Sequence, residues 1–136
     1  MKKIVFILGI VLVVVAYNYK NKTEKIEFAK VEQKIVVTAT MYMPTKGQCD
    51  SDPLVTACGK KINPEHASNH KWIAVSRDLL KIFKYGDVVQ LSNAGDKDGI
   101  YTIADTMNKR FKNKIDILET EGTKMYKLNN VIISKV

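Results

Sequence analysis

Hydrophobic and polar residues alternate in several short stretches of this chain, with the period of two that is typical of β-strands. The clearest stretch is Lys34–Met43, where β-branched and aromatic residues are frequent. Further strands are predicted at Trp72–Ser76, Asp87–Ser92, Gly99–Asp105, Lys114–Leu118 and Asn129–Ser134. Six short strands at this spacing predict a mainly β fold, a small barrel.

The predicted strands are joined by one short helix and several loops. Arg77–Phe83 fits a helix with Leu79, Leu80 and Phe83 facing inward, and Gly86-Asp87 fits a turn. In Gly99–Asp105 the residues Ile100, Thr102 and Ala104 fall on one face. A long loop, Thr45–Lys71, lies between the first two strands, and a loop of this length in a small domain is usually functional.

The N-terminus carries an apolar segment of a different kind. Lys2 and Lys3 precede an unbroken apolar run, Ile4–Ala16, which has the size of a signal-peptide core and is short for a membrane span. Cleavage after Ala16 is one interpretation. A second interpretation is an uncleaved anchor that includes Tyr17, with residues 4–17 associated with the inner membrane. A third interpretation is a buried helix. We expect residues 1–16 to be signal or anchor, 17–33 a polar linker and 34–136 the domain.

Export predicts a periplasmic or cell-surface location, and the charge of the chain fits that location. The formal net charge is +8, and without Lys2 and Lys3 there remain 20 basic and 14 acidic residues, a net +6. A basic exported domain favours anionic envelope polymers as partners. Nucleic acid is not expected, because aromatic residues are not interleaved with the basic ones.

Two cysteines, Cys49 and Cys58, lie in the long loop. In an oxidising compartment they could form a disulfide that closes a short loop. Two free thiols are the alternative. A metal site is not expected, because the spacing does not fit a zinc finger and His66 and His70 have no second ligand pair nearby.

The stretch Gly99–Leu118 contains the main candidates for chemistry, Asp105 and Asp116. Asp105 ends one predicted strand, and Asp116 lies within the next between Ile115 and Ile117. If these isoleucines point inward, Asp116 points to the opposite face. Two carboxylates on neighbouring strands could converge in a groove, where partial burial raises the pKa of one and leaves it able to protonate a glycosidic oxygen. Alternatively, such aspartates cap turns or pair with a basic neighbour, Lys114 or Arg110.

Other features have a structural and a functional interpretation. The small-residue segment Thr56–Gly59 is a turn or a close backbone approach to a ligand. Trp72 is a core residue or a platform for a sugar ring. The basic loop Thr106–Asn113 is a solvated face or a binding surface.

Several of these segments together resemble the three-aspartate (3D) domain, a double-psi β-barrel of bacterial cell walls. The resemblance covers Thr38 to about Leu118 and rests mainly on Ile103-Ala104-Asp105-Thr106 and Lys114-Ile115-Asp116-Ile117. Supporting segments are Thr38–Tyr42, Val55–Gly59, Ile73–Val75 and Tyr85–Val89. The family is similar to membrane-bound lytic transglycosylase A and rare lipoprotein A.

The resemblance implies a six-stranded double-psi β-barrel with short peripheral helices and an activity on peptidoglycan without a cofactor. Asp116 would be the acid that cleaves the bond between N-acetylmuramic acid and N-acetylglucosamine, leaving a 1,6-anhydro product. A charged Asp105 nearby and an apolar wall would keep Asp116 protonated. We expect substrate contacts from seven further residues: Tyr42, Thr56, Gly59, Asp78, Thr106, Asn108 and Arg110.

The sequence departs from the family pattern at two places. Ser76 stands where the first aspartate is expected, with Asp78 two residues on, and Met107 and Asn108 replace the glycines that usually follow the second motif. A module that binds peptidoglycan without cleaving it is therefore the alternative function.

Overall fold

The computed structural model describes residues 9–20, 33–48 and 52–136, and its contacts divide the chain into two units, Met1–Glu32 and Gln33–Val136. In the first unit, residues 9–20 form a helix with exposed side chains. Within the described ranges, none of the helices has the length and hydrophobicity that a membrane crossing requires. Residues 1–8 of the predicted leader lie outside the described residues.

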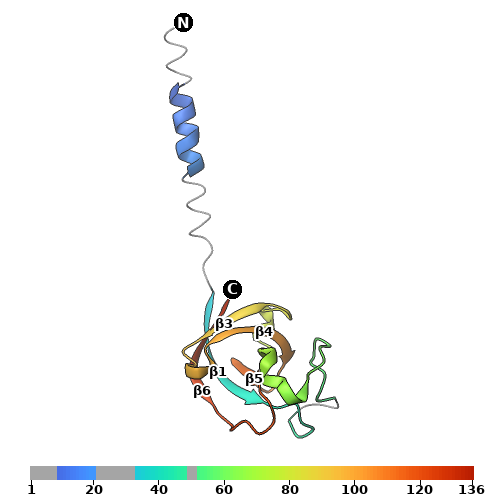
Figure 1. Ribbon diagram of the computed structural model, residues 1–136. Helices are drawn as coiled ribbons and strands as arrows, with labels where there is room; N and C mark the ends of the chain where they lie inside the picture. Colours follow the sequence, from blue (N-terminus) through green and yellow to red (C-terminus); the bar gives the residue numbers. More distant parts are fainter. Residues whose placement is uncertain (1–8, 21–32, 49–51) are drawn as a thin grey trace. The chain divides into compact units, whose positions relative to one another are not determined.

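The second unit is a closed six-stranded barrel (Figure 1). Its strands are β1 (Lys34–Tyr42), β2 (Trp72–Val75), β3 (Val88–Ser92), β4 (Gly99–Thr106), β5 (Lys114–Leu118) and β6 (Leu128–Lys135). They pair around the ring in the order β1-β5-β2-β4-β3-β6, with β1/β5 and β2/β4 parallel and the other pairs antiparallel. All six predicted strands are present, each with ends within one residue of those expected. The mainly β prediction is confirmed.

Alternate residues of the strands fill the interior of the barrel. On β5, Ile115 and Ile117 are 0% and 2% exposed and belong to the main hydrophobic core, as the sequence predicted. Val89, Leu91, Val131 and Ile133 supply the opposite wall. Burying an aliphatic side chain of this size stabilises the fold by about 1.5–3 kcal/mol, so the face that carries these residues is the inner face of each strand.

Strand β4 breaks the alternation once. It pairs with β2 in parallel, with Ile73 opposite Ile103, but the next residue of β2, Ala74, lies opposite Asp105. Ala104 is therefore an extra residue, a β-bulge, and it is fully buried. Before the bulge, Tyr101 and Ile103 face the core, so Ile100 and Thr102 share the opposite face, as predicted.

The connections contain three short 3₁₀ helices, η1 (Pro64–His70), η2 (Leu79–Lys81) and η3 (Gly95–Lys97). The predicted helix Arg77–Phe83 is reduced to η2, although Leu79 and Phe83 are buried as expected. Seven residues between a strand and a turn provide too few hydrogen bonds to offset helix nucleation. The predicted loop Thr45–Lys71 contains η1, whose first turn is capped by the side chain of Asn63.

A second apolar cluster covers the outer side of the barrel over β1, β5 and β2. Strand residues Tyr42, Ala74 and Leu118 form its base, and Ile62, Ala67 and Met107 from the connections pack over them, with Trp72 and Phe111 at the edges. The long loop and the loop after β4 are therefore fixed against the sheet by apolar contacts. Met107 is 6% exposed, so its side chain fills this cluster.

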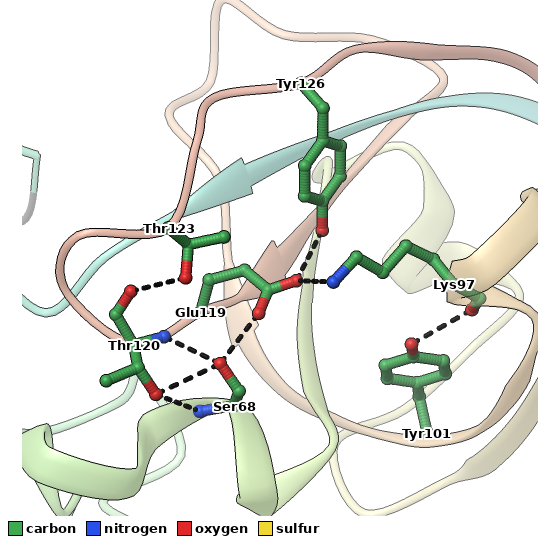
Figure 2. A network of polar contacts seen from close by, with 7 residues as sticks. All are labelled: Ser68, Lys97, Tyr101, Glu119, Thr120, Thr123 and Tyr126. Carbon is green, nitrogen blue, oxygen red and sulfur yellow. Dashed lines mark hydrogen bonds and ion pairs between the residues drawn. The ribbon is translucent and has the colours of Figure 1, made fainter.

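A buried polar network joins the connections at the end of β5 (Figure 2). Glu119 is 4% exposed. Its carboxylate accepts hydrogen bonds from the Ser68 hydroxyl and the Tyr126 hydroxyl, each at 2.7 Å, and forms an ion pair with Lys97 Nζ at 2.7 Å. Three hydrogen bonds join Thr120 to Ser68. The Thr120 amide donates to the Ser68 hydroxyl at 2.7 Å, the Ser68 amide donates to the Thr120 hydroxyl at 3.1 Å, and the two hydroxyls lie 3.0 Å apart. The network holds η1, η3 and the segment before β6 to one carboxylate.

The network sets the charge of its members. Burial alone would raise the pKa of Glu119, but the hydrogen bonds from Lys97, Ser68 and Tyr126 outweigh burial and lower that pKa. The pKa of Tyr126 is raised, by burial first and then by its bond to Glu119. Glu119 is therefore an anion in the folded protein, and Tyr126 stays a neutral donor.

We predict that Glu119→Gln lowers the free energy of unfolding by about 2 kcal/mol at pH 7, because hydrogen bonds to a charged group are worth about 1.5–3 kcal/mol. The pKa of Glu119 is lower in the folded than in the unfolded chain. Its contribution is therefore full above the unfolded pKa, about 4.3, and is lost as the pH falls through the folded value. Urea unfolding of the wild type and Glu119→Gln at several pH values between about 7 and 3 measures this difference in the free energy of unfolding.

Glu121→Gln is the matched control, because Glu121 is exposed and lies two residues further along the chain. This variant should unfold like the wild type at every pH. Equal stability of Glu119→Gln and Glu121→Gln at pH 7 would contradict the role given to the network.

Candidate functional site

The two predicted aspartates lie in one row across four strands of the barrel. Thr40 of β1 is opposite Asp116 of β5, Asp116 is opposite Ala74 of β2, and Ala74 is opposite Asp105 of β4. We call these four residues the aspartate row. Asp116 points away from the core because its neighbours Ile115 and Ile117 point into it. The predicted placement of both carboxylates on one side of the sheet agrees with this register.

The Asp116 carboxyl is half-buried and has few polar partners. Thr40 donates its hydroxyl proton to Asp116 Oδ1, and this is the side chain's one hydrogen bond within the described part of the chain. On its own face Asp116 lies between Lys114 and Leu118, and Leu118 belongs to the second apolar cluster. Burial raises the pKa of Asp116, and the Thr40 hydrogen bond and the charge of Lys114 oppose that rise without cancelling it.

Asp105 has a different environment, with a donor for each oxygen. Its Oδ1 accepts the backbone N–H groups of Ala57 at 2.9 Å and Thr106 at 2.8 Å. Its Oδ2 accepts the hydroxyl of Tyr42 at 3.3 Å. These bonds attach the loop that contains Ala57 to the end of β4. The Asp105 carboxylate therefore positions that loop.

The separation of the two aspartates limits how they can act together. Both are opposite Ala74, so their Cα atoms are two strand spacings apart, about 10 Å. A pair of carboxyls that shares one proton needs a separation of about 3 Å. One of the two predicted causes of the raised pKa of Asp116 is therefore confirmed, since burial raises it. The other is wrong, because the charge of Asp105 is not among the causes of the shift.

Four of the seven predicted substrate-contacting residues gather around Asp105. Tyr42 and Thr106 bond to it directly. Thr56 and Gly59 frame the turn above it: the amide of Gly59 donates to the carbonyl of Thr56 at 2.8 Å, and Gly59 has φ +83°. A positive φ of this kind favours glycine. The sequence interpretation of Thr56–Gly59 as a turn is confirmed, and the turn is tied to Asp105 through Ala57.

The other three predicted residues lie at different places. Asp78 accepts the amide of Asn113 at 2.9 Å and so fixes the start of β5. Asn108 accepts the amide of Arg110 at 3.1 Å within its own loop, and Arg110 is exposed with its guanidinium 4.7 Å from the ring centroid of Phe111. None of these three bonds involves Asp105 or Asp116.

Trp72 is half-buried at the edge of the second apolar cluster, so it is a packing residue. His70 stacks on its ring at a centroid distance of 4.2 Å, and Lys60 Nζ lies 5.2 Å from the ring centroid. The His70 Nε2 atom accepts the amide of Asn63 at 3.0 Å. No metal-binding cluster is present among residues 9–20, 33–48 and 52–136.

The predicted disulfide falls partly outside the described residues. The Cys58 thiol has no disulfide partner within residues 9–20, 33–48 and 52–136; it lies 3.3 Å from the hydroxyl of Thr56, and the Cys58 amide donates to the carbonyl of Ala104 at 3.4 Å. Cys49 lies outside the described residues. Pairing of Cys49 with Cys58 therefore stays a prediction.

Two partners of the aspartates are not evident from the sequence. Thr40 lies in the segment Thr38–Tyr42 without a signal of its own, and the Ala57 contact is made by a backbone amide, which has no side-chain signal. Thr40 lies on the same face of β1 as Thr38, which a period of two predicts. Its position opposite Asp116 depends on the parallel pairing of β1 with β5, a contact between residues 76 positions apart.

Comparisons with known proteins add no assignment: the chain matches no protein-family model and no curated protein sequence.

We predict that Asp105→Ala releases the loop at Ala57, because three donors lose their acceptor. The free energy of unfolding should fall by about 1–2 kcal/mol. The decrease is limited because water can form new hydrogen bonds with these accessible donors. Hydrogen exchange measured by NMR should show faster exchange at the amides of Ala57 and Thr106 and little change in the core of β5.

Two further variants test the explanation. Asp105→Asn keeps an oxygen that accepts both amides, so it should protect Ala57 and Thr106 better than alanine. Asp96→Ala is the matched control on an exposed residue. Unchanged exchange at both amides in Asp105→Ala would show that Asp105 does not hold the loop.

Proposed function

We propose that the chain is a peptidoglycan-active envelope protein with lytic transglycosylase activity and that Asp116 is its catalytic acid. The observation that carries the proposal is the environment of Asp116. This carboxyl is half-buried on the outer face of the barrel, next to an apolar cluster, with a raised pKa and one hydrogen-bond partner among the described residues. A carboxyl with a raised pKa is the group that acid catalysis near neutral pH needs.

The finer fold assignment is part of the same proposal. The closed sheet of six strands, with β1/β5 and β2/β4 parallel, agrees with the six-stranded barrel that the resemblance to the three-aspartate family implies. Together with the motifs around Asp105 and Asp116, it supports membership of that family. The N-terminal segment supports export, with the domain in the periplasm or at the cell surface and peptidoglycan strands as its partner.

The reaction needs one proton donor and no water. Asp116 gives its proton to the glycosidic oxygen as the bond from that oxygen to the muramic anomeric carbon breaks, which frees the N-acetylglucosamine hydroxyl. The muramic 6-hydroxyl then forms a bond to the anomeric carbon and returns its proton to the Asp116 carboxylate. The acid is regenerated, and the muramic end becomes a 1,6-anhydro sugar.

Asp105 has a supporting part in this proposal. Its three hydrogen bonds fix Tyr42 and the Thr56–Gly59 turn beside the aspartate row. At about 10 Å between Cα atoms, Asp105 is too distant to share a proton with Asp116 but close enough to orient one end of a bound disaccharide.

A peptidoglycan-binding module without cleavage is the second candidate. Two observations favour it: Ser76 replaces the first aspartate of the family pattern, and Asp105 is fully engaged in structural bonds. Digestion of purified peptidoglycan by the full-length protein separates the two functions. Anhydro-muropeptides detected by mass spectrometry support the enzyme, and binding without such products supports the module.

We predict that Asp116→Asn reduces formation of anhydro-muropeptides by about 10²–10⁴-fold, the usual contribution of general acid catalysis. The amide keeps the shape of the side chain and cannot donate a carboxylic proton. Because the folded protein disfavours the ionised form of Asp116, the variant should unfold at the same or a higher temperature at pH 7.

The alternative role of Asp116 as a structural partner predicts the opposite combination. Asp116→Asn would then lose stability, while the folded fraction kept normal activity. Activity and melting temperature measured on one preparation distinguish these results, and Asp96→Asn is the exposed control.

We also predict that Lys114→Met extends activity to higher pH. The enzyme needs the protonated form of Asp116, so activity falls as the pH rises through its pKa. The positive charge of Lys114 lowers that pKa, and removing the charge therefore raises it and moves the basic limb of the pH profile upward.

Lys112→Met is the control, because the charge of Lys112 acts on Asp78 instead. The difference between Lys114→Met and wild type should shrink in high salt, because Lys114 is only half-buried and its charge is screened. A basic limb that stays in place in Lys114→Met at low salt would rule out this coupling.

A further inference from the structure

The two strand neighbours of Asp116 differ in chemistry. On the β1 side Thr40 presents a hydroxyl, and on the β2 side Ala74 presents a methyl group. The Thr40 hydroxyl donates to Asp116 Oδ1. The carboxyl therefore has a polar side and an apolar side.

This asymmetry distinguishes the two carboxyl oxygens. Oδ1 accepts a hydrogen bond, so an acidic proton is placed better on Oδ2, which accepts no hydrogen bond within the described part of the chain. A carboxyl without such a partner could rotate and exchange the roles of its oxygens. A proton donor must be held in one orientation to reach the atom that it protonates.

We propose that Thr40 is a positioning residue: its hydroxyl holds Oδ1 of Asp116, so that Oδ2 is the oxygen that carries and transfers the proton. This inference rests on the proposed function for its chemical meaning. The geometry it uses, a hydroxyl directly opposite the carboxyl in the β1/β5 register, is independent of that function.

Two charged groups also face Asp116 and must be separated from the effect of Thr40. Lys114 lies two residues away on the same face of β5, and Asp105 lies beyond Ala74. The Thr40 bond favours the ionised form of Asp116, as does the charge of Lys114. The hydroxyl is neutral, however, so removing it should have an effect that persists in high salt.

The test uses the full-length protein with ¹³C-labelled aspartate and the variants Thr40→Val and Thr40→Ser. NMR titration of the Asp116 carboxyl reports its protonation without any substrate. We expect Thr40→Val to raise the pKa of Asp116 at low and high salt and Thr40→Ser to restore it. In the cleavage assay, Thr40→Val should move the basic limb of the pH profile upward and reduce the maximal rate by about 10- to 100-fold through lost orientation.

Thr38→Val is the matched control. Thr38 lies on the same face of β1 with similar exposure, but opposite Lys114. Its substitution should leave the Asp116 titration and the pH profile unchanged. If Thr40→Val does not fold, Thr40→Ala is titrated in its place.

The two proposals fail in different ways. An unchanged Asp116 titration in Thr40→Val or Thr40→Ala overturns the positioning role, whatever the activity. An equal shift in Thr38→Val also overturns it, because the effect would then be general to this face of β1. If the wild type yields no anhydro-muropeptides, the proposed reaction is wrong. A change in the Asp116 titration that occurs only in the Thr40 variants would still show that Thr40 holds the Asp116 carboxyl.

Discussion

One extra residue in β4 decides on which face of the barrel Asp105 lies. With a strict period of two, Asp105 would share the face of Tyr101 and Ile103 and point into the core. An ionised carboxylate there would be costly. The bulge buries the small side chain of Ala104 instead and turns Asp105 to the outer face, opposite Ala74. The aspartate row and the attachment of the Thr56–Gly59 turn both depend on this shift.

The buried acids of the domain fall into two classes. Glu119 receives three donors, and its pKa is lowered. Asp116 receives one donor, and its pKa is raised. Glu119 therefore contributes to stability as an anion, whereas ionised Asp116 reduces stability. A residue that the fold tolerates at such a cost is a candidate for function, because perturbed pKa values cluster at functional sites.

The strands could be predicted from sequence because their signals are local. β-branched residues at alternate positions, together with glycine and proline at the ends, placed all six strands within one residue. The inward direction of Ile115 and Ile117 followed from the same pattern. The short helix was overpredicted because the apolar spacing of Leu79, Leu80 and Phe83 does not report how few residues are available for helical hydrogen bonds.

The site could be predicted only in part, because its contacts join distant segments. Asp105 and Asp116 were found from their motifs, but the bulge that brings them to one face leaves no local pattern. Thr40 and the amide of Ala57 reach their carboxylates across 76 and 48 residues. The Glu119 network likewise unites residues from four segments, none of which carries a motif.

The same electrostatics apply to Ser76, which stands where the sequence resemblance predicts an aspartate. Ser76 is fully buried, and it continues the β2/β5 pairing: its amide donates to the carbonyl of Lys114 at 2.9 Å, and its hydroxyl accepts the amide of Lys114 at 3.0 Å. By alternation it lies on the face of Ala74. An aspartate there would add a negative charge near Asp116, whereas serine supplies the hydrogen bond without the charge. Burial is then the main cause of the raised pKa of Asp116, and serine at position 76 adds no charge that would change it.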